Sequence, residues 1–216
     1  AEIRERVEKE LRMINELGFA AYFLINWDIV RYAQRRGYFY VGRGSGANSV
    51  VAYCLRITDV DPIDLDLYFE RFINPFRQNP PDFDLDFSWK DRDDLTAYIF
   101  RRYGEEHTAL LATYSTYQSK AIVRELGKVF GLPKEEIDAL QNTRDGESVG
   151  EGIAKLIREF SLLMHDFPHH LSIHAGGVII SEKPIACYTA LNHPPKGFPV
   201  TQFSMLESED IGLYKY

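Results

Sequence analysis

Apolar residues recur three or four positions apart at the start of the chain: Ile3, Val7, Leu11, Ile14 and Leu17. This spacing predicts an amphipathic helix over residues 2–17, which Gly18 ends. The next segment, residues 20–36, is predicted to form a second helix that stops at Gly37. Further helices are predicted from about residue 47, from Asp61-Pro62 to about Phe72, and over residues 92–103.

Strand patterns alternate with these helices at four places: residues 38–41, 81–87, 107–113 and 176–181. Between the last two, residues 117–170 are mainly helical in pattern, with breaks at 131–133 and 142–148. The segment 193–199 is rich in loop-forming residues. This order predicts an α/β domain that a helical insertion interrupts.

The composition is that of a globular protein, with 45% hydrophobic and 26% charged residues. No apolar run reaches the roughly 18 residues of a membrane span, and the charged opening AEIRERVEKE does not resemble a signal peptide. The only cysteines, Cys54 and Cys187, lack CxxC partners, which favours a reducing cytoplasm over a disulfide framework or a zinc site. The formal net charge of -7 argues against nucleic-acid binding unless the charges are segregated.

The segment PDFDLDF carries the strongest chemical signal. Period-2 alternation puts Asp82, Asp84 and Asp86 on one strand face and apolar side chains on the other. Crowded carboxylates repel each other unless a cation lies among them, and magnesium prefers carboxylate and phosphate oxygens. An isolated DxD would favour a solvated edge strand, but the flanking phenylalanines indicate a buried strand with a two-metal site for phosphoryl transfer.

The segment GRGSGANS, residues 42–49, is the second signal. Its three glycines and two serines stand between a predicted strand and a predicted helix. Glycines let a phosphate approach the backbone, and a helix N-terminus offers free N–H groups. Ser45 and Ser49 could donate their hydroxyls, and Arg43 could pair with phosphate. A flexible loop that caps a helix is the alternative, and no Walker A lysine follows.

A third feature is a basic stripe of Lys120, Arg124 and Lys128, which recur every four residues. On an acidic chain such a stripe fits a phosphate backbone, although a solvated helix face would look the same. Two other groups are interpreted as structural: the acidic residues between Asp59 and Asp66 as helix caps, and the histidines between His165 and His174 as loop or surface residues.

Several longer segments now combine into one resemblance. GRGSGANSVVAYCLRITDVDPIDLDLYFERFINP, PDFDLDF, TYQSKAIVRELGKVFGLP, HAGGVIIS and PVTQF follow one another in this order. Together they closely resemble the alpha subunit of bacterial DNA polymerase III, the C family of DNA polymerases. The resemblance implies a nucleotidyltransferase palm of polymerase-beta type with a mixed sheet, and a helical thumb inserted in it. It departs from the family at Asn48, where glycine is usual.

The resemblance also implies roles for single residues. Asp84 and Asp86 match the first two metal-binding, catalytic carboxylates, and Asp82 matches an acidic position that is not a ligand. The nucleotide-binding set would be Arg43, Gly44, Ser45, Gly46, Ser49, Arg71 and Arg77. Lys120, Arg124 and Lys128 would contact DNA. Two Mg²⁺ ions, which Mn²⁺ could replace, would serve the complete enzyme.

Three segments are expected from the resemblance: palm over 1–115, thumb over 116–173 and palm again over 174–216. The strand at 176–181 should pair back into the sheet that carries 82–87. The function implied is template-directed transfer of a dNTP to a primer 3′-hydroxyl on primer–template DNA. Replisome subunits such as a sliding clamp would bind regions that lie outside this chain.

The family's third catalytic aspartate would directly follow the counterpart of Tyr216, so this chain alone is expected not to polymerise. Two alternatives stay open: a stand-alone nucleotidyltransferase that acts on a small acceptor, and a DNA- or nucleotide-binding module without turnover. The basic stripe at Lys120, Arg124 and Lys128 favours the polymerase, because a small acceptor does not require it.

Overall fold

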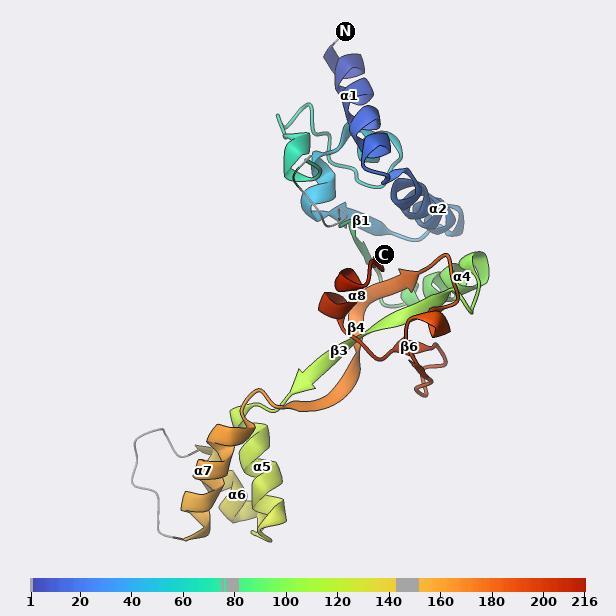
Figure 1. The fold of residues 1–216 in the computed structure, drawn as a ribbon. Helices are drawn as coiled ribbons and strands as arrows, with labels where there is room; N and C mark the ends of the chain where they lie inside the picture. Colours follow the sequence, from blue (N-terminus) through green and yellow to red (C-terminus); the bar gives the residue numbers. More distant parts are fainter. Residues whose placement is uncertain (1, 75, 77–81, 143–151) are drawn as a thin grey trace. The chain divides into compact units, whose positions relative to one another are not determined.

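A computed structural model describes residues 2–74, 76, 82–142 and 152–216 (Figure 1). The chain divides into two compact units. Unit 1 comprises Ala1–Leu111 and His174–Tyr216, and unit 2 comprises Ala112–Ile173. The described residues form a mixed α/β fold with eight α-helices.

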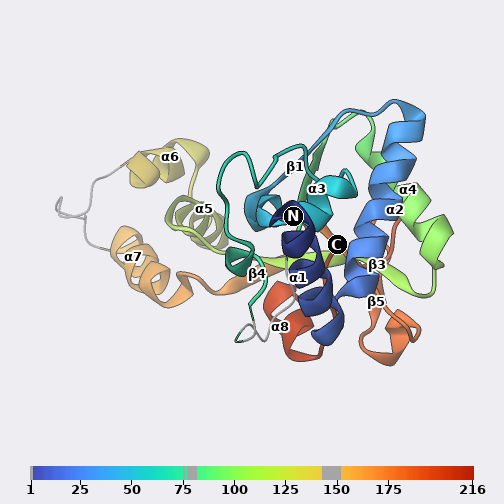
Figure 2. The same ribbon diagram turned by 90° about the horizontal axis from the view of Figure 1, so that it is seen from above.

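Unit 1 begins with helices α1 (Glu2–Glu16) and α2 (Ala20–Arg36), as the sequence predicts. Gly37 ends α2 in the left-handed conformation, with φ +71°, which glycine adopts without steric cost. Helix α4 (Arg92–Tyr103) also has its predicted bounds. It lies beside α2 in both views (Figure 1 and Figure 2). Tyr32 of α2 stacks on Tyr98 of α4 with ring centroids 3.8 Å apart.

The carboxylate-bearing strand β2 (Asp84–Phe87) pairs antiparallel with β1 (Tyr40–Arg43). Both strands begin a few residues later than their sequence patterns predict. After β1 the chain forms a short 3-10 helix, Gly44–Asn48, and then helix α3 (Val50–Cys54). Phe83 and Phe72 are both buried in the core that α1, α2 and α3 surround, so the aromatic positions next to β2 attach it to that core.

The helix predicted from Asp61 to Phe72 is wrong. The Asp61 carboxylate does cap a turn, since it accepts hydrogen bonds from the backbone N–H of Ile63 and Asp64. Asp66 then takes a left-handed conformation with φ +48°, which interrupts the helix after one turn. The carbonyl of Leu67 accepts a hydrogen bond from Arg6 instead of from a later turn. A short 3-10 helix, Phe69–Arg71, follows.

A second sheet has the strand order β4-β3-β6-β5. Its strands are β3 (Thr108–Thr116), β4 (Pro168–Ile180), β5 (Leu191–Asn192) and β6 (Val200–Thr201). The sheet is mixed, because β3 and β6 run parallel whereas β5 and β6 run antiparallel. Its core includes Leu111, Ile179 and Phe203.

The expectation that residues 176–181 pair into the sheet of residues 82–87 is wrong, because β4 and β2 belong to different sheets. The end of the chain lies next to β4 instead. Val178 and Tyr216 exchange two backbone hydrogen bonds of 3.0 and 2.8 Å. The Tyr216 ring packs on Tyr22, at a centroid distance of 5.1 Å, and joins the core around Phe83. A backbone segment therefore takes the position next to β4 that β2 was expected to fill.

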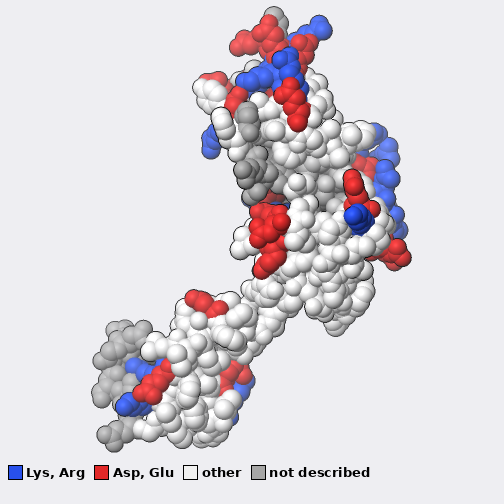
Figure 3. Space-filling view, viewed as in Figure 1, with Lys and Arg blue, Asp and Glu red and all other residues white. Residues whose placement is uncertain are grey.

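Helix α8 (Met205–Asp210) was not predicted. A capping box joins Ser204 and Glu207 at its start, and this Ser-x-x-Glu spacing is a signal that the sequence carries. Acidic side chains gather over α8 (Figure 3). None of the helices within the described ranges combines the length and the apolar character needed to cross a bilayer.

Unit 2 contains helices α5 (Ser119–Val129), α6 (Lys134–Asn142) and α7 (Ile153–Met164). Each helix buries one isoleucine: Ile122, Ile137 and Ile157. A Cβ on Gly127 would lie 2.7 Å from Ile137, so the close approach of α5 and α6 requires glycine there. The break predicted at 131–133 separates α5 from α6, whereas that at 142–148 lies almost entirely outside the described residues. Strand β4 begins at Pro168, slightly before the predicted end of the helical region.

Candidate metal and nucleotide site

Two carboxylates of β2 share one face of the β1–β2 pair. In the strand register Asp84 lies opposite Arg43 and Asp86 lies opposite Val41. The side chains of Asp84 and Asp86 are 41% and 56% exposed, so both can reach a ligand from solvent. The buried Phe83 precedes them on the chain and fixes the strand from the core side. The predicted buried strand is only partly buried: Leu85 and Phe87 are half-buried like Asp84, and only Phe83, just before β2, lies fully in the core.

The guanidinium of Arg43 contacts both carboxylates. Its Nε donates to Asp86 Oδ2 at 2.5 Å, and its Nη2 lies 3.4 Å from the other Asp86 oxygen. Its Nη1 lies 3.3 Å from Asp84 Oδ2. The hydrogen bond to Asp86, followed by the charges of both carboxylates, raises the pKa of Arg43, so the guanidinium stays charged. A cation thus lies among the crowded carboxylates, as their mutual repulsion requires.

Asp82 has a different cationic partner. Its carboxylate forms an ion pair with Lys215 Nζ at 2.9 Å, whereas Asp84 and Asp86 share Arg43. The same lysine also acts on His174: burial, followed by the charge of Lys215, lowers the pKa of that histidine. The three aspartates of PDFDLDF are therefore divided between two positive groups.

The glycine-rich loop packs directly against β2. Gly44 has φ +79°, and a Cβ there would lie 2.7 Å from Asp84 Oδ2. A Cβ on Gly46 would lie 2.4 Å from the Phe83 ring. Ser45 between them is half-buried, and its carbonyl accepts a hydrogen bond of 2.7 Å from the Asn48 side chain. Glycine is needed at 44 because of its positive φ, and at 46 because a Cβ there would collide with the Phe83 ring.

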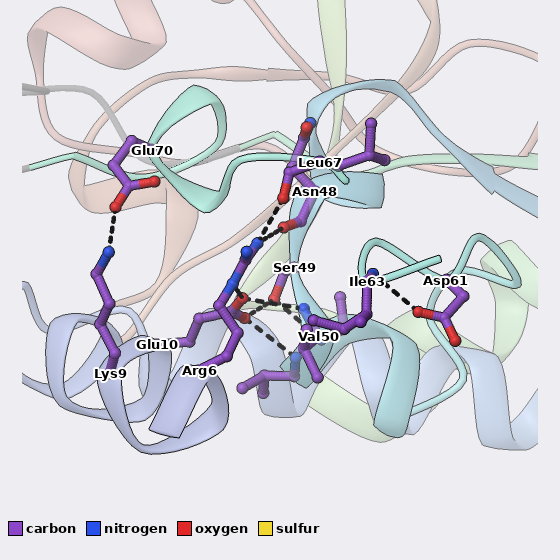
Figure 4. Close-up of polar contacts among 12 residues, drawn as sticks. Arg6, Lys9, Glu10, Asn48, Ser49, Val50, Asp61, Ile63, Leu67 and Glu70 are labelled. Carbon is purple, nitrogen blue, oxygen red and sulfur yellow. Dashed lines mark hydrogen bonds and ion pairs between the residues drawn. The ribbon is translucent and has the colours of Figure 1, made fainter. Parts of the chain in front are cut away.

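The expected role of the α3 N-terminus and of Ser49 requires a correction. Figure 4 shows the carboxylate of Glu10, from α1, at the start of α3. It accepts hydrogen bonds from the backbone N–H of Val50 at 3.2 Å and of Val51 at 3.1 Å. The hydroxyl of Ser49 also donates to Glu10, at 2.8 Å, and accepts from the N–H of Ala52. The sequence predicts that the Ser49 hydroxyl and the N–H groups at the start of α3 bind phosphate, but in the structure they donate to the carboxylate of Glu10.

Glu10 is fully buried, and Arg6 balances its charge. Arg6 Nε donates to Glu10 at 2.8 Å, and Nη2 donates to the carbonyls of Asn48 and Leu67 (Figure 4). Glu10 thereby ties α1 to the end of the glycine-rich loop. Sequence reasoning missed it among the charges of ERVEKE. The available signal was its position, because Glu10 falls three residues after Val7 and four before Ile14, within the apolar stripe of α1.

The remaining predicted site residues are not brought to these carboxylates by any described contact. Arg71 is exposed in the 3-10 helix Phe69–Arg71, and Arg77 lies outside the described residues. Lys120, Arg124 and Lys128 are exposed on α5 in unit 2. Glu125 forms ion pairs with Arg124 at 3.2 Å and with Lys128 at 3.0 Å, which offset part of the positive charge of the stripe.

The donor set at β2 suits a divalent cation. Within the described ranges, histidine, cysteine and acidic side chains form no metal-competent cluster of three or more. Asp84 and Asp86 nevertheless converge on one cation, the guanidinium of Arg43. Carboxylate oxygens are the ligands that Mg²⁺ and Mn²⁺ prefer, and Mg²⁺ commonly binds one or two carboxylates together with substrate phosphates.

A mixed α/β domain with paired carboxylates beside a glycine- and serine-rich loop is suited to phosphoryl-transfer chemistry. The chain belongs to the family described as the bacterial DNA polymerase III alpha NTPase domain, whose family model matches residues 1–216. The family resemblance carried by the sequence motifs is thereby confirmed.

Curated relatives include both replicative and error-prone polymerases. The chain is 39% identical to the error-prone DNA polymerase of Symbiobacterium thermophilum, over 99% of this chain and 21% of that protein. It is 40% identical to the DNA polymerase III subunit alpha of Bacillus subtilis, over 97% of this chain and 20% of that protein. It is 36% identical to the DNA polymerase III subunit alpha of Borreliella burgdorferi, over 100% of this chain and 20% of that protein. The chain spans about a fifth of the length of these relatives.

Proposed function

We propose that this chain is the nucleotidyl-transfer region of a bacterial DNA polymerase, which joins a dNTP to a primer 3′-hydroxyl on a DNA template. One observation carries the proposal: Asp84 and Asp86 converge on a single cation directly beside the glycine-rich loop at Gly44–Gly46. In this proposal unit 1 is the palm and unit 2 is the inserted thumb. The two free, exposed cysteines fit a cytoplasmic enzyme.

Asp84 and Asp86 would hold Mg²⁺ in this site, or Mn²⁺ in its place. The bound metal would neutralise charge on the phosphates and polarise the phosphoryl group that reacts. Asp82 would stay outside the ligand set, because Lys215 neutralises it. Lys215 and Tyr216 pack against Asp82 and Tyr22, which brings the segment that precedes the expected third carboxylate close to the start of β2.

The exposed backbone of Gly44 and the half-buried Ser45, with its hydroxyl, would contact the triphosphate. Gly46 is buried, so its part in the proposed site would be to pack the loop against Phe83. We exclude Ser49 from direct contact, since its hydroxyl is buried against Glu10. Its part would be to cap α3 and so fix the end of the loop. The role of Arg71 beside the triphosphate stays a proposal from the resemblance alone.

The basic stripe of α5 would bind the phosphate backbone of primer–template DNA. Lys120 is exposed and is separate from the Glu125 ion pairs that involve Arg124 and Lys128. In this proposal Lys120 is the strongest phosphate partner of the three. A sliding clamp and other replisome subunits would bind elsewhere on the complete protein.

The test compares metal binding by three variants of one strand. Mn²⁺ binding to the chain, followed by water proton relaxation, should weaken strongly in Asp84→Asn and in Asp86→Asn. Asp82→Asn is the matched control, since it removes a neighbouring carboxylate that pairs with Lys215. Equal losses in all three variants would refute the assignment of ligands, and no loss in any would refute the site.

A kinetic measurement on the complete polymerase separates catalysis from nucleotide binding alone. Ser45→Ala removes a hydrogen bond to a charged group, which costs about 1.5–3 kcal/mol. The Michaelis constant for the dNTP in primer extension should therefore rise roughly 10- to 150-fold. An unchanged constant would contradict the role of Ser45. Metal and nucleotide binding without extension by the complete protein would favour a binding module instead.

A further inference from the structure

We propose that Arg43 is an internal cation that exchanges with the metal: it neutralises Asp84 and Asp86 in the metal-free protein and leaves them when a divalent cation binds. The inference rests on the proposed function, because it concerns the same two carboxylates. It gives Arg43 a second position, at the phosphates of the nucleotide, and it couples the binding of the metal to the binding of the nucleotide.

The geometry makes guanidinium and metal compete for the same atoms. Arg43 contacts both oxygens of Asp86 and the Oδ2 atom of Asp84. A metal shared by Asp84 and Asp86 would take its ligands from these oxygens, in the space that the guanidinium fills. A guanidinium and a divalent ion cannot occupy that space together, because both carry positive charge and both require the same lone pairs.

The exchange of guanidinium for metal costs little free energy. The side chains of Arg43, Asp84 and Asp86 are 59%, 41% and 56% exposed. Ion pairs at such exposure are screened by water and contribute little to stability. A divalent cation interacts with two carboxylates more strongly than a single delocalised charge does, so the metal should displace the guanidinium.

Phosphate at the glycine-rich loop would be the second partner of Arg43 once it is displaced. It is the last residue of β1, and Gly44, with φ +79°, turns the chain directly into the glycine-rich loop. The side chain therefore starts at the junction between the carboxylate strand and the loop. A guanidinium binds phosphate oxygens through two parallel N–H bonds. A nucleotide that holds Arg43 at its phosphates would thus free the carboxylates for metal, and by linkage the metal would favour the nucleotide.

The experiment measures Mn²⁺ affinity without nucleotide in the wild-type chain and in Arg43→Gln and Arg43→Lys. Arg43→Gln should bind Mn²⁺ about fivefold more tightly, the factor that one exposed ion pair supplies. Arg43→Lys should also bind more tightly than wild type. Lysine keeps the positive charge but has only one nitrogen with which to contact the two carboxylates. A general field effect would leave the lysine variant unchanged, and that result would overturn the exchange.

The matched control is Arg102→Gln on α4. Arg102 pairs with Asp28 at 3.1 Å, and its side chain is 56% exposed, which matches the 59% exposure of Arg43. The variant therefore removes a comparable exposed guanidinium away from Asp84 and Asp86. Its Mn²⁺ affinity should equal that of wild type. A second readout is the NMR signal of the Arg43 Nε–H group, which should move on addition of Mg²⁺ in wild type and stay in place in Asp86→Asn, where the metal ligand is lost.

The outcomes separate this inference from the proposed function. Mn²⁺ binding that depends on Asp84 and Asp86 but is equal in wild type and both Arg43 variants would overturn the exchange alone. Mn²⁺ binding that does not depend on those carboxylates would overturn the metal site itself. Tighter binding in both Arg43 variants, together with a metal-dependent shift of the Arg43 signal, would support the exchange.

Discussion

Helix α1 contains two Arg–Glu pairs of the same spacing in opposite environments, which allow the buried carboxylate of Glu10 to be tested. Arg4 and Glu8 lie 3.0 Å apart with side chains 86% and 56% exposed. Arg6 and Glu10 lie 2.8 Å apart with side chains 21% and 0% exposed. We predict that Glu10→Ala destabilises unit 1 far more than Glu8→Ala does.

The magnitude follows from the groups that lose a partner. Glu10→Ala leaves the mostly buried charge of Arg6 uncompensated and removes the acceptor of the Ser49 hydroxyl and of the Val50 and Val51 N–H groups. Removing one partner of a buried ion pair costs about 3–5 kcal/mol. An exposed helical pair of this spacing contributes about 0.3–0.5 kcal/mol, which sets the expectation for Glu8→Ala.

The assay is thermal unfolding followed by tryptophan fluorescence, because Trp27 and Trp89 both belong to unit 1. A loss of 1 kcal/mol shifts the midpoint of a domain of this size by about 2–4 °C. Glu10→Ala should therefore lower the midpoint by roughly 6–20 °C, and Glu8→Ala by about 2 °C or less. Midpoints within 2 °C of each other would refute the reasoning, because burial would then add nothing to the pair. Faster amide exchange at Val50 and Val51 in Glu10→Ala should locate the damage at the start of α3.

Three further outcomes are expected. Gly46→Ala should destabilise unit 1 by about 1–3 kcal/mol in urea unfolding, because its Cβ would collide with the Phe83 ring. Gly176→Ala should cost much less, because a Cβ at residue 176 would meet no atom within 4 Å, and equal costs would contradict the close contact at Gly46. The pKa of His174 is lowered by burial, so the unfolded chain binds its proton first and stability falls as the pH drops below about 6.5. His174→Gln should therefore lose less stability than wild type between pH 7 and pH 5, and a parallel loss would show that another group is responsible. In the complete polymerase, Lys120→Ala should weaken primer–template binding and reduce the salt slope by about 0.9, and an unchanged slope would remove Lys120 from the DNA contacts.

The sequence alone was sufficient for elements whose signals are local. Helix α1 follows from apolar spacing, because a helix buries one face. Gly37 and Gly104 mark where α2 and α4 end, because glycine lets the backbone turn there. The alternation around Asp84 and Asp86 follows equally from the period of a strand. The family was also accessible, since its motifs stand in order along the chain.

Partners distant in sequence were decided only by the tertiary structure. Apolar spacing cannot reveal that Glu10 fills the α3 N-terminus, because the groups that donate to its carboxylate lie about 40 residues further along the chain. Pattern alone also cannot choose the neighbour of β4, which is the backbone at Tyr216 and not β2. The cation between Asp84 and Asp86 is Arg43 for the same reason: strand register, which long-range pairing sets, brings it opposite Asp84. Local periodicity reports which face of an element is buried, and only the packed chain determines what that face meets.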